Sequence, residues 1–315
     1  MQIDPLKLFE KACFIRAFEY EIAYQCDAGA VPGLAHLSTG TEVADVSLAA
    51  ALDPSTDRVT GSHRSHGLAL AMGADPVLVA KEILGRVGGL SDGLAGTQHL
   101  IAPEVGFLTS NGIVGAQVPL AAGAALTAKT TANGGVGAAV FGDGAANQGA
   151  VLETMNLAVS LALPMVFILY NNGVAQTTSA VFASGGNSFA GRAASFGLNG
   201  FAADSRDLAS CTHAFVQATK SARAFKPAFV EVCVARDDGH YYGETVASRG
   251  ADNDGDAIRA LRSQLLANGI DPLVCEQVKT AADTLAGKSI TTALAAPKAG
   301  SEQFERWITI AEARP

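Results

Sequence analysis

The stretch VGAAVFGDGAANQG, Val136 to Gly149, runs from a continuous apolar segment into a glycine-rich turn that carries one carboxylate, Asp143. A short apolar run of this kind is typical of a strand buried on both faces of a parallel sheet. The turn has Asn147 where a dinucleotide-binding fingerprint needs its third glycine, and it lacks the Gly-Lys-Ser/Thr ending of a P-loop. The carboxylate in this turn therefore needs its own explanation.

Asp143 would repel a phosphate group bound by the turn. A carboxylate about 4 Å from a phosphate oxygen is repelled by roughly 4 kcal/mol at an effective dielectric constant near 20. A magnesium ion removes this repulsion, because it commonly joins one or two carboxylates to substrate phosphates. The next apolar run ends in Asn171 and Asn172, whose amide oxygens also suit magnesium. On spacing alone, ordinary turn-forming Asp and Asn residues are an equally good explanation.

Strand patterns alternate with helix patterns on both sides of this stretch. The runs VGAAVFGDG, LPMVFILYNNG and PAFVEVCVARDDGH are separated by helical patterns over 149–162 and 204–224, the second capped by Asp204 or Ser205. This order predicts an α/β fold, with a parallel sheet, helices on both faces, and ligands at the carboxyl ends of the strands. The polar residues that follow the strands are expected on one edge.

The rest of the chain adds helices at both ends. Helical patterns over 6–27 and 43–52 precede a short strand near 58–60, and patterns over 257–268 and 272–285 follow a polar segment. We therefore predict one domain over 1–315, with an N-terminal helical extension and a C-terminal helical tail from about residue 250.

Composition excludes several classes of protein. The net charge of −8 without any Lys/Arg cluster argues against nucleic acid as a partner. The longest apolar region, 151–170, contains Glu153, Asn156 and Pro164, so no membrane span is expected. Five scattered cysteines without a C-x-x-C pair suggest neither a disulfide framework nor a zinc site, which favours the cytoplasm.

The spacing of GDG and NN is one of several motifs that point to the same family. Together with VPGLAHLSTGTE, GSHRSHG, GTQHL, NGIVGAQVPLAAGAAL and RDDGH, it resembles the alpha subunit of the thiamine diphosphate-dependent first component of 2-oxo acid dehydrogenase and acetoin dehydrogenase complexes. The resemblance extends from about residue 8 to residue 249. It implies the diphosphate-binding module of the thiamine diphosphate-binding fold, with thiamine diphosphate and Mg²⁺ as cofactors. The implied reaction is cleavage of acetoin, or oxidative decarboxylation of a 2-oxo acid such as pyruvate, with transfer of the acyl group to lipoyl.

The resemblance also implies roles for individual residues. The magnesium ligands it implies are Asp143, Asn172 and the backbone carbonyl of Val174. The residues it implies in cofactor binding are Arg64, Gly112, Val114, Gly142, Asp143, Gly144, Asn172 and Arg236. Catalytic roles are implied for His66 and His240.

Several positions depart from the family pattern. His63 stands where a tyrosine is common, and Val174 where an aromatic residue is common. Asp237 and Asp238 replace aromatic or basic residues, which leaves the choice of substrate open. Tyr241 stands where phosphorylation-controlled relatives carry serine, so regulation at that position is not expected.

The partners follow from the same resemblance. A beta subunit would supply the glutamate that activates the cofactor, in an α2β2 assembly, and a lipoyl-bearing acyltransferase would receive the product. Two other classes remain open. One is an NAD-dependent dehydrogenase, which uses a similar sheet but needs the third glycine. The other is a non-catalytic alpha-like scaffold subunit, which the unusual acidic pair would fit.

Overall fold

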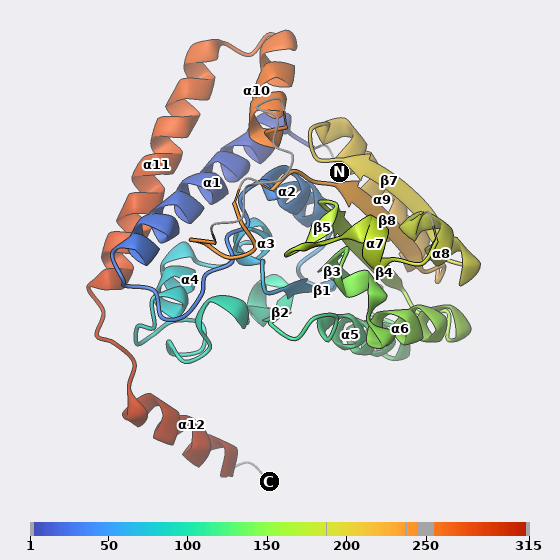
Figure 1. The fold of residues 1–315 in the computed structure, drawn as a ribbon, viewed down its shortest axis with the longest axis horizontal. Helices are drawn as coiled ribbons and strands as arrows, with labels where there is room; N and C mark the ends of the chain where they lie inside the picture. Colours follow the sequence, from blue (N-terminus) through green and yellow to red (C-terminus); the bar gives the residue numbers. More distant parts are fainter. Residues whose placement is uncertain (1–2, 187, 237, 245–254, 313–315) are drawn as a thin grey trace.

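A six-stranded parallel sheet forms the centre of the computed structural model, which describes residues 3–186, 188–236, 238–244 and 255–312 (Figure 1). Every neighbouring pair of its strands is parallel. In spatial order the strands are β2 (Phe107–Asn111), β1 (Arg58–Ser62), β3 (Gly137–Gly142), β4 (Met165–Asn171), β8 (Ala228–Cys233) and β7 (Asn199–Asp204). The predicted parallel α/β sheet is confirmed.

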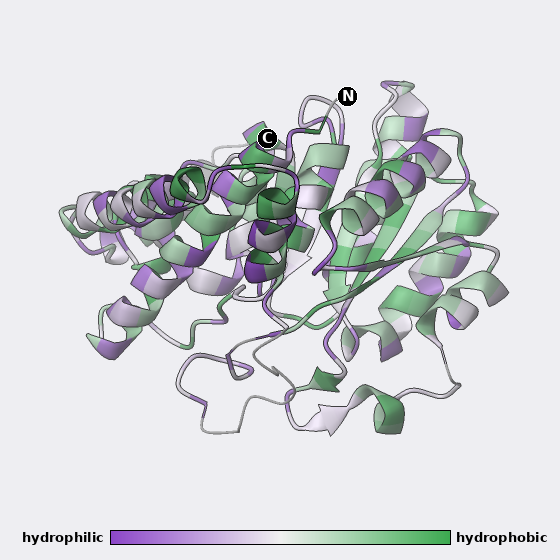
Figure 2. Cartoon of the chain, turned by 90° about the horizontal axis from the view of Figure 1, so that it is seen from above, coloured by the Kyte–Doolittle hydropathy of each residue, from purple (hydrophilic) through white to green (hydrophobic). Residues whose placement is uncertain are grey.

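Helices cover both faces of this sheet. Along β3, Ala138 and Val140 belong to one buried apolar cluster, whereas Ala139 and Phe141 belong to another on the opposite face. The first cluster is completed by α1 (Pro5–Asp27), α2 (Glu42–Ala51), α3 (His66–Met72), α4 (Pro76–Ile83), α9 (Leu208–Arg223), α10 (Ala257–Ala267) and α11 (Pro272–Leu294). The second is completed by α5 (Gln117–Thr131), α6 (Gly149–Ser160) and α8 (Phe189–Ser195). Figure 2 shows mainly apolar strands between these layers.

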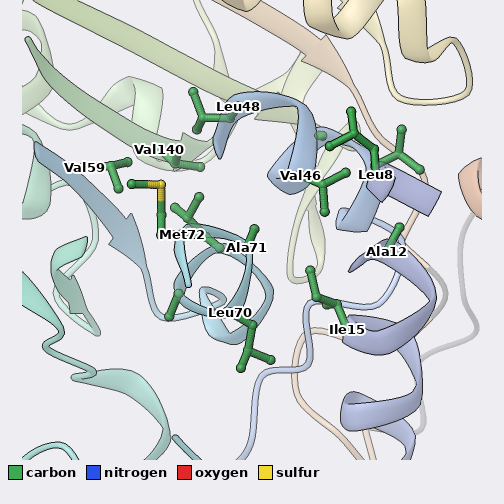
Figure 3. Close-up of a cluster of buried hydrophobic side chains, with 14 of the residues drawn as sticks. Leu8, Ala12, Ile15, Val46, Leu48, Val59, Leu70, Ala71, Met72 and Val140 are labelled. Carbon is green, nitrogen blue, oxygen red and sulfur yellow. The ribbon is translucent and has the colours of Figure 1, made fainter. Parts of the chain in front are cut away.

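The helices before β3 are held in place by buried apolar side chains. In Figure 3, the side chains of α1 and α2 meet those of α3 beside Val59 of β1 and Val140 of β3. The buried residues labelled there are Leu8, Ala12, Ile15, Val46, Leu48, Val59, Leu70, Ala71, Met72 and Val140. Because α3 packs against α1 and α2, the turn between β1 and α3, residues 63–65, is held at the carboxyl end of the strand.

The remaining elements are short or peripheral. These are β5 (Val174–Ala175), β6 (Thr178–Ser179), α7 (Ala180–Ala183) and α12 (Ser301–Glu312), with 3-10 turns at Gly96–Gln98, Pro103–Val105 and Ala145–Asn147. Figure 1 shows α12 apart from the other helices, after an extended segment. No helix in the described part of the chain has the length and apolar character needed to cross a membrane.

Two sequence predictions needed correction. The helix expected from residue 204 begins at Leu208, where Asp207 caps it by accepting hydrogen bonds from the backbone of Ala209 and Ser210. Asp204 instead ends β7, a strand that the sequence analysis did not predict. β7 is an edge strand with mostly exposed side chains, so it lacks the apolar run that marks a central strand.

Candidate active site

One pocket lies at the carboxyl ends of β1, β3, β4 and β8. Nine of the sequence-predicted site residues line it. They are Arg64, Val114, Gly142, Asp143, Gly144, Asn172, Val174, Arg236 and His240. The fold brings them together because parallel strands end at one edge of the sheet, with Gly142 of β3 paired to Tyr170 of β4.

Asp143 supplies a buried carboxylate to this pocket. One of its oxygens, Oδ1, accepts a hydrogen bond of 2.7 Å from the backbone nitrogen of Gly144. The other, Oδ2, is buried and has no hydrogen-bond partner among the described residues. Burial raises the pKa of this carboxyl group, although the backbone N–H groups of Gly144 and Gly173 oppose that effect. An unpartnered buried oxygen is costly, so the geometry fits a ligand that is bound through Oδ2.

The two asparagines after β4 have different environments. Both polar atoms of the Asn171 side chain already have hydrogen-bond partners. Nδ2 donates to Glu231 Oε1 at 2.8 Å, and Oδ1 accepts from the backbone nitrogen of Gly173 at 2.9 Å. Asn172 lines the pocket together with Asp143. These hydrogen bonds therefore leave Asn172, and not Asn171, available to a ligand held by Asp143.

Arg64 and Arg236 bring two positive charges to the same pocket. Among the described residues, Arg64 donates to the backbone carbonyls of Leu37 and His240 and to no side chain, and Arg236 Nε donates to the carbonyl of Asp238 at 3.0 Å. Loss of water around Arg64 lowers its pKa to about 9, and the charge of Arg236 acts in the same direction. Within residues 3–186, 188–236, 238–244 and 255–312, no carboxylate forms an ion pair with either guanidinium. Two unneutralised cations in one pocket suit a multiply charged anion.

His240 lies at the pocket, whereas His66 does not. Burial and the neighbouring arginines lower the pKa of His240, so its ring is neutral near pH 7. His66 is fully buried, with Nδ1 3.1 Å from Glu19 Oε2 and Nε2 2.6 Å from Thr97 Oγ1. Its catalytic role stays a prediction, because the structure places both ring nitrogens against protein groups away from the pocket lining.

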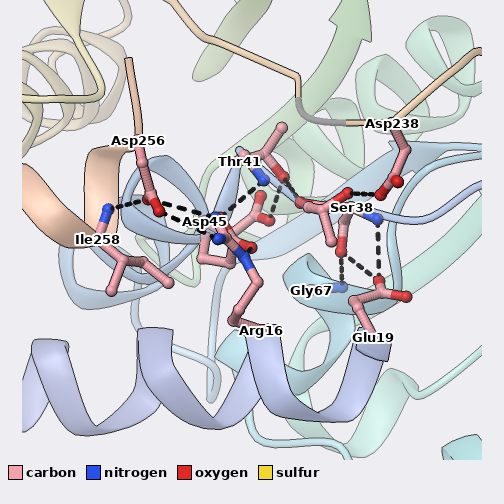
Figure 4. Close-up of polar contacts among 12 residues, drawn as sticks. Arg16, Glu19, Ser38, Thr41, Asp45, Gly67, Asp238, Asp256 and Ile258 are labelled. Carbon is pink, nitrogen blue, oxygen red and sulfur yellow. Dashed lines mark hydrogen bonds and ion pairs between the residues drawn. The ribbon is translucent and has the colours of Figure 1, made fainter. Parts of the chain in front are cut away.

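A polar network beneath the pocket joins α1 to the loop before α2 (Figure 4). Glu19 of α1 accepts from the backbone nitrogen and the hydroxyl of Ser38, and Ser38 Oγ accepts from the nitrogen of Gly67 at 2.9 Å. Thr39 in the same loop donates to the carboxylate of Asp238. Asp238 therefore links this loop to the segment that carries Arg236, while Asp237 lies outside the described residues.

The structure also adds pocket residues that sequence reasoning missed. Gln117 donates its amide to the carbonyl of Val140 at 3.0 Å, and its buried Oε1 has no hydrogen-bond partner in the described part of the chain. A lone polar residue in the Ala-rich run was its only sequence signal.

Gly112 follows β2 and is not in the lining, but a Cβ atom there would lie 2.5 Å from Gln98 Oε1. Because Gln98 Oε1 is the end of a flexible side chain that can move aside, this contact alone does not require glycine at position 112.

The buried carboxyl group of Asp45 forms hydrogen bonds with two residues of the pocket lining. Its carboxylate accepts hydrogen bonds from Tyr170 Oη at 3.0 Å and from Thr41 Oγ1 at 2.9 Å. Burial raises the pKa of Asp45 to about 8, against an ordinary value of 3.8. The group is therefore protonated in the folded chain at neutral pH.

The variant Asp45→Asn tests this assignment through the pH dependence of stability. A raised folded-state pKa means that the parent loses stability as pH rises from about 4 to about 8, because the unfolded chain ionises first. Asparagine does not titrate, so the free energy of unfolding of the variant should rise relative to the parent across that range. Urea unfolding at pH 5 and pH 8 measures the difference. If the free energies of unfolding of variant and parent differed by the same amount at pH 5 and at pH 8, the assignment of a protonated Asp45 would be wrong.

Comparison with known proteins agrees with this architecture. The family model described as dehydrogenase E1 component matches residues 10–296. The chain is 38% identical over 247 residues to the alpha subunit of acetoin:2,6-dichlorophenolindophenol oxidoreductase from Cupriavidus necator, an alignment that covers 78% of this chain and 74% of the relative. It is 37% identical over 295 residues to the pyruvate dehydrogenase E1 component subunit alpha from Zymomonas mobilis, which covers 89% of this chain and 83% of the relative. The chain belongs to the dehydrogenase E1 component family.

Proposed function

We propose that this chain is the alpha subunit of a thiamine diphosphate-dependent dehydrogenase, which cleaves acetoin or oxidatively decarboxylates a 2-oxo acid such as pyruvate and passes the acyl group to lipoyl. Family membership and the names of both kinds of relative support the proposal. The observation that carries it is the pocket itself, where an unpartnered carboxylate oxygen of Asp143 shares a lining with Arg64 and Arg236. A diphosphate with a magnesium ion matches these charges.

Each pocket residue has a role in this proposal. Asp143, Asn172 and the carbonyl of Val174 would hold Mg²⁺, and Arg64 and Arg236 would bind the diphosphate. Gly112 and Val114 would contact the aminopyrimidine ring through their backbone, and Gly142 and Gly144 would let the chain approach the phosphates. When bound, thiamine diphosphate supplies the electron sink for cleavage of the bond next to the carbonyl group. The chain supplies position, charge and exclusion of water.

His240 is the chain's own candidate for proton transfer. Its lowered pKa keeps the ring neutral, so the ring accepts a proton at neutral pH. The variant His240→Ala should therefore keep the affinity for thiamine diphosphate within a few fold but slow acyl transfer to lipoyl by about 10²-fold. The measurement is single-turnover transfer in the complete complex, with calorimetry for cofactor binding. Equal transfer rates in variant and parent would remove His240 from the mechanism.

The partner is proposed from the exposed apolar side chains near the pocket. In α7, Val181 and Phe182 are 93% and 86% exposed, and Ile113, beside the lining residue Val114, is 69% exposed. Apolar residues exposed together in this way mark an interaction surface. A beta subunit that covers them in an α2β2 assembly would supply the activating glutamate, and a lipoyl-bearing acyltransferase would be the third component. We also propose that residues 1–315 form one domain and that the protein acts in the cytoplasm.

The substrate is tested by reconstitution. Co-purification with the natural partner is followed by parallel assays of acetoin, pyruvate and 3-methyl-2-oxobutanoate, with thiamine diphosphate, Mg²⁺ and an artificial electron acceptor. Turnover of one of the three supports the proposal and selects the substrate. Two alternatives give different results: an NAD-dependent dehydrogenase would be thermally stabilised by NAD and not by thiamine diphosphate with Mg²⁺, and a scaffold subunit would bind neither.

A further inference from the structure

Three histidines from distant parts of the sequence meet beside the pocket. His36 precedes α2, His63 lies between β1 and α3, and His240 follows β8. One ring nitrogen from each lies within 4.8 Å of the other two. The ring centroids are 4.6 Å apart for His36 and His63, 5.0 Å for His36 and His240, and 5.2 Å for His63 and His240. Such spacing lets three imidazoles converge on one ion after small side-chain rotations.

Burial and nearby positive charges keep the three rings neutral at pH 7, so each ring has one unprotonated nitrogen that can bind a metal ion. His36 Nδ1 lies 3.1 Å from the carbonyl oxygen of Leu34, to which it donates, and this hydrogen bond leaves Nε2 unprotonated. The side-chain nitrogen of Gln98 lies 3.3 Å from the same Nδ1. The oxygen and nitrogen of an amide are assigned from their hydrogen bonds, and with the two exchanged the Gln98 oxygen accepts a hydrogen bond from Nδ1. Burial and the charge of Arg64 lower the pKa of His36 to about 4 and that of His63 to about 2. Among the described residues, the rings of His63 and His240 have no hydrogen-bond partner.

The donor set selects a class of cation. Three neutral imidazoles without a carboxylate suit Zn²⁺, Co²⁺, Ni²⁺ or Cu²⁺, whereas Mg²⁺ prefers oxygen ligands. Three-histidine sites typically keep a fourth position for water or another ligand. We propose that His36, His63 and His240 form a second metal site, separate from the carboxylate and amide of the proposed magnesium site, which takes a cation of the Zn²⁺ class with its fourth position open to the pocket.

The surrounding charges set limits on this site. Arg64 and Arg236 repel a cation, whereas Glu244, whose carboxylate accepts from the backbone nitrogen of His240, attracts one. His63 and His240 both line the pocket. A bound ion therefore holds the segment that carries His240 against the turn before α3, next to the diphosphate-binding residues of the proposed function. While it is bound, the ion also takes the lone pair with which His240 accepts a proton in the proposed function, so the ion-bound form is an inhibited one.

Cobalt binding to the full chain, freed of metal by a chelator, tests the site without cofactor or turnover. The parent should bind one equivalent of Co²⁺ with the strong visible absorption of four-coordinate cobalt, and Zn²⁺ should displace it and raise the melting temperature. His63→Tyr, which restores the residue common in the family, should weaken binding by at least about tenfold, because even the loss of a group that only supports a ligand costs about 10–100-fold. His36→Gln should do the same.

The controls separate this site from other metal ligands. All proteins carry Cys233→Ser, because that thiol is exposed, and His213→Asn in α9 serves as the matched histidine variant that should bind like the parent. His63 is partly exposed, so its replacement tests the site even where a variant of the buried His36 folds poorly. Co²⁺ affinity and absorption that are equal in His63→Tyr and the parent, or the absence of four-coordinate cobalt in the parent, would overturn the proposal. Because no thiamine diphosphate is present, neither result depends on the proposed dehydrogenase function.

Discussion

Asp143→Asn is expected to weaken Mg²⁺-dependent binding of thiamine diphosphate by about a thousandfold. The parent offers a charged, unpartnered Oδ2 to the ion, whereas asparagine offers no charge. Attraction between unit charges about 4 Å apart is worth roughly 4 kcal/mol at an effective dielectric constant near 20, and each 1.4 kcal/mol is a factor of ten in affinity. Calorimetric titration of the subunit with its partner, with and without Mg²⁺, measures the effect.

The stability of the cofactor-free variant distinguishes lost binding from lost folding. Burial raises the pKa of Asp143, so at neutral pH the charged form destabilises the folded chain, and Asp143→Asn should unfold at the same or a higher temperature than the parent. Asp204→Asn is the control, because Asp204 ends the outermost strand β7, three strands from β3, at the same carboxyl edge of the sheet but outside the pocket lining. It should bind the cofactor like the parent. If Asp143→Asn also kept parental affinity and Mg²⁺ dependence, the assignment of Asp143 would be wrong.

The purified chain without its partner is expected to show no measurable turnover of acetoin or a 2-oxo acid, and addition of the partner should raise the rate by at least about 10²-fold. The reason is that the activating glutamate is assigned to the partner, and a positioned proton-transfer group contributes about 10²–10⁴ to a rate. The exposed Val181 and Phe182 lie on the surface that we assign to the partner, so replacing them tests that assignment. Replacing both with serine should weaken assembly and lower turnover together, whereas Leu273→Ser, an exposed apolar residue in the distant α11, should change neither.

Sustained turnover by a homogeneous preparation of the single chain would contradict the assignment of the activating glutamate to the partner. Sedimentation of the mixture measures assembly directly. Full assembly with Val181 and Phe182 replaced would place the partner on another face of the molecule.

The sequence was enough to predict the central strands and the residues that follow them. Buried parallel strands such as β3 and β4 have continuous apolar runs, and the polar residues after them had to meet at one sheet edge. The edge strand β7 escaped prediction because exposed side chains remove that pattern. The tail helix α12 follows the segment 295–300, which contains Pro297 and Gly300, and was likewise not predicted.

In the site, likewise, the sequence did not predict the environment of individual side chains. Nothing local in the sequence distinguishes Asn171 from Asn172, because the difference arises from the hydrogen bond to Glu231 on the neighbouring strand. The buried position of His66 depends on Glu19 in α1, 47 residues away in sequence. Long-range contacts of this kind require the folded chain, so residue types and spacing predict the pocket but not the orientation of each group in it.

The central claim is that a divalent ion joins this chain to a diphosphate through the turn after β3. The most direct measurement is a crystal structure of the subunit with its partner, grown with thiamine diphosphate and Mg²⁺. We expect the ion on Asp143, Asn172 and the carbonyl of Val174, with Arg64 on the phosphates. An ion that contacts neither Asp143 nor Asn172, or a cofactor bound away from Arg64, would contradict it.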